Sequence, residues 1–141
     1  MTLPGFMPYG GARLRLARRP MVTSEAKSIG DALTQTATAE TLSAAASNGL
    51  FYAVYMDADR TSASTDVTTM YSVMLCTPDL QWLFNREAGT FTVADINTDA
   101  DLNSADGIAI DTSTNDDFHV DWRIDANTGI GRFNNVFPRT L

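Results

Sequence analysis

The residues with the clearest potential for chemistry lie between Asp95 and Gly107, where the sequence reads DINTDADLNSADG. Acidic or amide side chains recur at nearly every second position, and oxygen ligands at such spacing are typical of a loop that binds Ca²⁺. An EF-hand loop also needs glycine at its sixth position and glutamate at its twelfth. Counted from Asp95, these positions hold Ala100 and Asp106, so the sequence excludes an EF-hand.

Two interpretations of the acidic stretch remain. A looser calcium site would take Asp99, Asp101 and Asp106 as its ligands. The alternative is an exposed polar loop between two strands, in which the carboxylates are solvated and bind no ion. We predict the exposed loop, with no metal and no other cofactor.

The single histidine and the single cysteine are the remaining candidates for catalysis. His119 lies between Asp117 and Asp121 and could act as a general base oriented by a carboxylate. The alternative is an exposed strand histidine paired with a surface acid. Cys76 ends an apolar run, where a buried structural thiol is commoner than a nucleophile. Because the motifs of serine hydrolases, zinc proteases and P-loop proteins are missing as well, we predict that the protein is not an enzyme.

Arginines and leucines alternate near the N-terminus: the basic residues are Arg13, Arg15, Arg18 and Arg19, and the apolar ones are Leu14 and Leu16. In an extended strand, this pattern places arginines on one face and leucines on the other. Such a segment could add to the edge of a neighbouring chain's sheet, with the guanidinium groups forming forked hydrogen bonds to carboxylates. In the alternative, the arginines pair with the acidic part of their own chain.

Charge divides the chain into a basic start and an acidic remainder. Residues 1–27 hold five basic residues and one acid, a net charge of +4, whereas the other 114 residues hold five arginines and 16 acids, a net charge of −11. This predicts an extended basic arm over residues 1–27 and a single β domain over residues 28–141. A segment packed on its own domain explains the same composition. The acidic remainder argues against a nucleic-acid partner, because phosphates repel it.

The segments that must position these residues are predominantly β. The expected strands cover residues 50–56, 70–76, 80–84, 90–96, 107–110, 117–124 and 130–137. The first is an unbroken apolar run, typical of a strand buried on both faces. Residues 70–76 and 80–84 form either two strands or one interrupted strand. In the range 117–124, strict alternation predicts that Phe118, Val120, Trp122 and Ile124 face the core.

Residues 31–49 are ambiguous, because they fit either a weak helix ended by Asn48–Gly49 or extended structure. With 141 residues, of which 44% are hydrophobic, the chain can bury the core of one domain. Nothing approaches eighteen consecutive apolar residues, so no membrane partner is expected. The predicted fold is therefore all-β, a small, jelly-roll-like β-sandwich or barrel with an extended N-terminal arm.

From Tyr71 to Phe137, four segments follow one another in a recognisable order: YSVMLCTPDLQWLF, TVADINTDADL, DTSTNDD and DFHVDWRIDANTGIGRFNNVF. An apolar strand enters a Pro-Asp turn and an aromatic strand, an Ala-Asp segment and a polar loop follow, and the pattern ends in a hairpin. This order resembles head-decoration, or cement, proteins of tailed bacteriophages, which bind the outer surface of icosahedral capsids. The resemblance covers about half of the chain and is a pattern of features.

The resemblance implies a non-enzymatic virion protein, made in the host cytoplasm, that bridges capsid subunits against the pressure of packaged DNA. Its partners would be the major capsid protein and other copies of itself, as a homotrimer. The expected contact residues are Phe6, Tyr9, Arg13, Leu14, Arg15, Leu16, Arg18 and Arg19. The alternative function is a virion adhesin or carbohydrate-binding module of the neck, tail or fibre. Its sugar-stacking aromatics would be Tyr52, Tyr55, Trp82 and Trp122, although core positions account better for these side chains.

Overall fold

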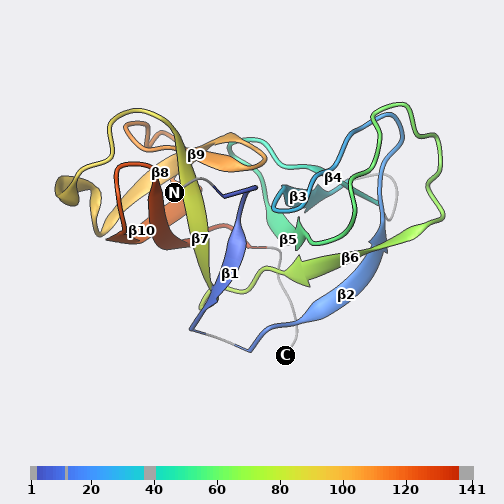
Figure 1. Ribbon diagram of the computed structural model, residues 1–141, viewed down its shortest axis with the longest axis horizontal. Coiled ribbons are helices and arrows are strands. Elements are labelled where there is room, and N and C mark those ends of the chain that lie inside the picture. Colours follow the sequence, from blue (N-terminus) through green and yellow to red (C-terminus); the bar gives the residue numbers. More distant parts are fainter. Residues whose placement is uncertain (1–2, 12, 37–40, 137–141) are drawn as a thin grey trace.

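The computed structural model describes residues 3–11, 13–36 and 41–136, which form two β-sheets joined by one hydrophobic core (Figure 1). The prediction of a small all-β barrel or sandwich is confirmed. Besides strands, the described residues contain one short 3₁₀ turn, η1, at Val93–Asp95. No helix within these ranges is long and apolar enough to cross a membrane.

The first sheet closes into a barrel. Its strands, in spatial order, are β1 (Met7–Gly10), β7 (Gln81–Ala88), β11 (Thr128–Phe133), β10 (Phe118–Arg123), β8 (Thr98–Ser104) and β9 (Gly107–Ala109). The last of these, β9, also pairs in parallel with the second half of β7, and this contact closes a ring of five strands. Strand β1 pairs with the first half of β7. Closure removes most of the unpaired strand edges that an open sheet would expose.

The five strands of the second sheet pair in an antiparallel manner, and the sheet is open except for one parallel bridge between Met21 and Leu42. Its order is β2 (Leu16–Pro20), β6 (Met70–Leu75), β5 (Phe51–Tyr55), β3 (Ala32–Gln35) and β4 (Leu42–Ala44). The described parts of residues 31–49 are therefore predominantly extended, in β3 and β4, and Asn48 adopts a positive φ of 65° in the turn that follows β4. Residues 70–76 and 80–84 belong to two strands in different sheets, and the turn at Pro78 carries the chain from one sheet to the other.

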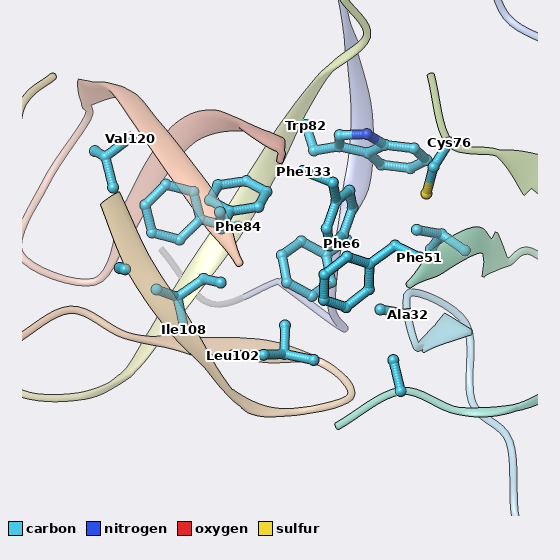
Figure 2. Close-up of a cluster of buried hydrophobic side chains, with 14 of the residues drawn as sticks. Phe6, Ala32, Phe51, Cys76, Trp82, Phe84, Leu102, Ile108, Val120 and Phe133 are labelled. Atoms are coloured by element: carbon cyan, nitrogen blue, oxygen red, sulfur yellow. The ribbon is translucent and has the colours of Figure 1, made fainter. Parts of the chain in front are cut away.

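Aromatic side chains fill the core between the sheets (Figure 2). Phe6 is fully buried at its centre, and its ring centroid lies 5.5 Å from that of Phe118 and 4.9 Å from that of Phe133. The second sheet adds Phe51 and Cys76 to the same core, and the burial of Cys76 is as predicted. Since both sheets contribute, neither buries its inner face without the other.

A second, smaller core lies on the opposite face of the open sheet. Its members are Met21, Leu33, Leu42, Ala53, Tyr55 and Val73. Strand β5 separates the two cores, because Val54 belongs to the first and Ala53 to the second. This confirms that the unbroken apolar run marks a strand buried on both faces. Buried Arg60 donates hydrogen bonds to the backbone carbonyls of Val22 and Asp66 and so connects the loops that contain these residues.

The N-terminal segment is built into both sheets. Strand β1 pairs with β7, strand β2 pairs with β6, and Phe6 and Met21 are fully buried in the first and second cores. Residues 3–11 and 13–27 therefore pack on the same two sheets as the rest of the described chain, which is the second interpretation of this segment. The segment packs on the sheets because burial of Phe6 and Met21 removes their apolar surface from water.

Three local expectations are wrong. The acidic stretch is largely strand β8 rather than a loop, with Ala100 and Leu102 buried. Residues 92–95 form the capped 3₁₀ turn η1 instead of a strand, because Thr92 and Asp95 make a capping box. Trp122 and Ile124 are 58% and 43% exposed, because a bulge between Val120 and Trp122 breaks the alternation of β10.

Candidate interaction surface

Strand β2 forms the outer margin of the open sheet (Figure 1), and residues 16–20 pair only with β6 among the described strands. Directly after β2, Met21 forms a parallel bridge with Leu42 of β4, so the free edge ends there. The amide of Leu75 donates to the carbonyl of Arg15. In an antiparallel ladder, alternate residues direct their backbone groups to the same neighbour. Residues 15, 17 and 19 therefore bond towards β6, whereas Leu16 and Arg18 direct their N–H and C=O groups outwards.

The C-terminal half of this edge is partly protected. Pro20 has no amide hydrogen, and the carbonyl of Arg18 accepts a hydrogen bond of 2.8 Å from Nη1 of Arg19. Proline and charged side chains are common devices against edge-to-edge association. The stretch from Leu14 to the amide of Arg18, called the β2 edge below, has no such protection among the contacts of the described residues.

Exposed leucines accompany the open backbone. Leu14 and Leu16 are 50% and 69% exposed. Leu16 and Arg18 share one face of the strand, whereas Arg15, Ala17 and Arg19 share the other, where Ala17 packs on the second core. The predicted separation into a leucine face and an arginine face is therefore wrong at Arg18, because the spacing of the arginines changes from two residues to three.

A cavity of about 360 Å³ lies at the end of β2 and is called the arginine groove below. Its lining residues are Arg18, Arg19, Pro20, Gln35, Leu42, Tyr52 and Met70. Nε of Arg19 donates to the hydroxyl of Tyr52 at 3.0 Å, and its guanidinium carbon lies 5.7 Å from the ring centroid. Nη2 of Arg18 donates to the carbonyl of Met70 at 2.7 Å. Both cationic groups are thus held in place by neutral partners.

The arginine groove is positively charged within an acidic protein. Among the lining residues that the structure describes there is no carboxylate, and the ion pairs in this part of the chain involve Lys27, His119 and Arg132 instead. Two fixed guanidinium groups with unused N–H donors suit a carboxylate, which accepts forked hydrogen bonds. The groove and the β2 edge are continuous, because Arg18 belongs to both.

The other expected contact residues lie in different places. Phe6 is fully buried in the first core and is not available to a partner. Tyr9 lies on β1 and Arg13 precedes β2, and both side chains are exposed. Gln35, Leu42 and Met70 also line the groove and are not predicted from the sequence, because no local pattern marks residues that meet only in the folded sheet.

The calcium candidates do not come together. Asp101 is buried, and its carboxylate accepts hydrogen bonds from the backbone amides of Thr114, Asn115 and Asp116 at 2.8–3.1 Å. Asp99 contacts His119, and Asp106 accepts from the hydroxyl of Ser104 at 2.6 Å. Across residues 3–11, 13–36 and 41–136, no group of three or more acidic, histidine or cysteine side chains is arranged to hold a metal ion.

Asp106 also affects a neighbouring carboxyl group. The Ser104 hydroxyl lies 2.5 Å from Oε1 of Glu87 and 2.6 Å from Oδ1 of Asp106, although it has only one proton to donate. Partial burial raises the pKa of Glu87, and the nearby Asp106 carboxylate raises it further. Glu87 therefore holds its proton to a higher pH than an isolated glutamate.

His119 is paired with an acid on the barrel surface, as the second interpretation of this residue states. Its Nδ1 lies 2.9 Å from Oδ1 of Asp99, and its Nε2 lies 3.1 Å from Oδ1 of Asn97. Partial burial acts to raise the pKa of Asp99, but hydrogen bonds from His119 and Asn134 outweigh it and leave this pKa below its usual value. No hydroxyl or thiol is among the hydrogen-bond partners of His119 in the described ranges, so the arrangement is not that of a base beside a nucleophile.

The four aromatics of the sugar-binding alternative do not form a platform. Tyr55 and Trp82 are fully buried, and Tyr52 is half-buried in the arginine groove. Trp122 alone among them is largely exposed. Core positions therefore account for Tyr55 and Trp82, whereas the expectation of a core position is wrong for Trp122.

Comparison with known proteins adds no assignment. The chain matches no family model, and no curated protein or solved structure is significantly similar to it. The interpretation of the β2 edge depends on the geometry described above and on the pattern in the sequence.

Proposed function

We propose that this chain is a structural virion protein that decorates the outer surface of a tailed-phage head and docks there through the β2 edge. The observation that carries the proposal is the open edge itself, with unpaired backbone groups, two exposed leucines and arginines that lack carboxylate partners among the described residues. The order of features from Tyr71 to Phe137 supplies the resemblance to capsid cement proteins.

The edge has the properties of a docking site rather than of ordinary surface. Unpaired strand edges with apolar side chains promote association, and soluble proteins normally protect them. In this protein, Pro20 and the Arg19 side chain protect the edge only from the carbonyl of Arg18 onwards. The residues before it, from Leu14 to the amide of Arg18, have no such protection among the described contacts. The net charge of −7 keeps free copies apart, whereas the local arginines attract an acidic partner.

In this proposal, the protein acts by holding capsid subunits together and not by catalysis. Each bound copy would bridge subunits of the major capsid protein, alone or as a homotrimer, and so resist outward pressure from packaged DNA. Individual contacts need only modest affinity, because many bridges on one closed lattice act together through a high effective concentration. No catalytic step is assigned, and the predominantly acidic surface argues against a nucleic-acid partner.

Copy number in purified particles tests this proposal. We expect mass spectrometry to find this polypeptide at a ratio near one to the major capsid protein, or at a simple fraction of it, because cement proteins occupy the whole lattice. A few copies per particle would instead favour an adhesin of the neck, tail or fibre, in which exposed Trp122 offers a stacking surface for a sugar. Absence from particles would overturn both functions.

A further inference from the structure

We propose that the β2 edge binds an extended segment of its partner in which apolar and acidic side chains alternate, with one carboxylate of that segment in the arginine groove. The inference deepens the proposed function and rests on it for the identity of the partner, a capsid protein. The segment's chemistry, however, follows from the geometry of residues 14–20 alone.

The backbone of the β2 edge defines how such a segment can pair. Leu16 directs both its N–H and C=O groups away from β6, and Arg18 directs its N–H group the same way. An added strand can bond to these groups as a further strand of the open sheet. Pairing must end at Pro20, which has no amide hydrogen to donate.

The side chains of β2 then select the side chains of the partner. Residues directly opposite each other on adjacent strands share a face, with Cβ atoms about 4.5–5.5 Å apart. The partner residue beside Leu16 is therefore favoured if it is apolar, because contact removes the exposed leucine from water. Partner residues beside Arg15 and Arg19 fall on the other face and are favoured if they are acidic. Alternation of the two types follows.

The arginine groove adds a defined place for one carboxylate. Arg18 uses one N–H donor and Arg19 uses two in the contacts described above, out of five on each guanidinium. Gln35 contributes an amide to the lining, and no acid among the described lining residues competes for these donors. A carboxylate in this position gains charge-assisted hydrogen bonds without first breaking an ion pair.

A second copy of the same chain does not offer this segment within its described edges. The other described strand with an open edge, β1, reads MPYG and contains no acid, whereas the outer side of β4 is bonded by Val22 and Glu25. The strands that combine acidic and apolar residues, β7, β8 and β10, are enclosed in the barrel by neighbours on both sides. None of the described strands of a second copy supplies such a segment, and we assign it to a different protein.

Short labelled peptides test the chemistry of the occupant with the full-length chain. One peptide alternates valine and glutamate, a second replaces each glutamate with serine, and a third replaces each with lysine. Fluorescence anisotropy should show saturable binding of the glutamate peptide, binding of the serine peptide that is weaker by about tenfold or more, and none of the lysine peptide. Equal binding of the glutamate and lysine peptides, or no binding of any peptide, would overturn the inference.

Matched variants test the site. Leu16→Pro removes an outward amide without affecting the bonds to β6, and Arg19→Gln removes one charge from the groove. Each should weaken binding of the glutamate peptide by about tenfold. As controls, Leu50→Ser changes another exposed leucine and Arg86→Gln changes an arginine that also bonds backbone carbonyls, and both should retain the affinity of the original chain. Equal losses in the control variants would contradict the assigned site.

The two proposals fail separately. If the chain is present across the capsid lattice but the glutamate peptide does not bind, the proposed function stands and the alternating segment is wrong. If the peptide binds through Leu16 and Arg19 but the chain is absent from particles, the site stands and the capsid is the wrong partner.

Discussion

Replacing Phe6 with alanine is expected to lower the free energy of unfolding by about 3–5 kcal/mol, the range for truncation of a buried aromatic side chain. Phe6 is fully buried and packs between the rings of Phe118 and Phe133, where it joins the N-terminal segment to the barrel. The midpoint of thermal unfolding, followed by circular dichroism, should fall by about 10 °C or more.

Tyr9→Ala is the control for Phe6→Ala, because Tyr9 lies in the same N-terminal segment but is exposed. Its effect should stay within about 0.5 kcal/mol. Equally small effects of both substitutions would mean that the segment does not contribute to the core. The expected difference also means that deletion of residues 1–20 cannot test docking, because it removes β1, β2 and Phe6 and so destabilises the whole fold.

The second large effect is expected at Asp101. Asp101→Ala should lower the free energy of unfolding by about 3–5 kcal/mol. Three backbone amides now donate hydrogen bonds to the buried carboxylate of Asp101, and all three would lose their acceptor. Equilibrium unfolding in urea would measure the loss, and addition of Ca²⁺ or of a chelator should leave it unchanged.

Asp106→Ala provides the matched control for Asp101, since Asp106 belongs to the same acidic stretch but is only partly buried. Its effect should lie within about 1 kcal/mol and can be stabilising, because the substitution removes repulsion from Glu87. Similar losses at Asp99, Asp101 and Asp106, together with destabilisation by a chelator, would indicate that the three carboxylates do share a calcium ion.

The parts of the fold that the sequence predicted are those with a strong local pattern. The run from Leu50 to Met56 identifies β5 as a strand buried on both faces, because no polar residue interrupts it. Alternation identifies β10 up to Val120. It fails at Trp122, because the bulge arises from pairing with β11, where Trp122 lies opposite Ile130. Local alternation contains no information on the register of a partner strand.

The acidic stretch differs from the prediction for a related reason. A run of carboxylates indicates a solvated loop only if each carboxylate needs water, but here distant parts of the chain bind the buried ones. Asp101 accepts from residues 114–116, and fully buried Asp117 accepts from the hydroxyl of Ser47 and the amides of Asn48 and Leu102. These partners lie 13 to 70 positions away in the sequence, so strand β8 could not be recognised from its own composition.

The candidate site could be predicted only in part. The clustering of arginines and leucines identifies residues 13–19 as a surface of interest, and the structure places five of them, residues 15–19, against β6. The arginine groove could not be predicted, because Gln35, Leu42 and Tyr52 approach Arg19 only when four strands are aligned in register. The free edge itself depends on which strand ends the sheet, and no local signal determines that.

Occupancy on the capsid tests the central claim most directly. Particles that lack this protein would be incubated with the original chain, with Leu16→Ser or with Leu50→Ser, and bound copies would be counted against the major capsid protein. Both leucines are exposed, at 69% and 42%, but Leu16 alone lies on the β2 edge. We predict that Leu50→Ser fills the lattice like the original chain and that Leu16→Ser leaves most sites empty at the same concentration. Equal occupancy by the two variants would contradict docking through β2.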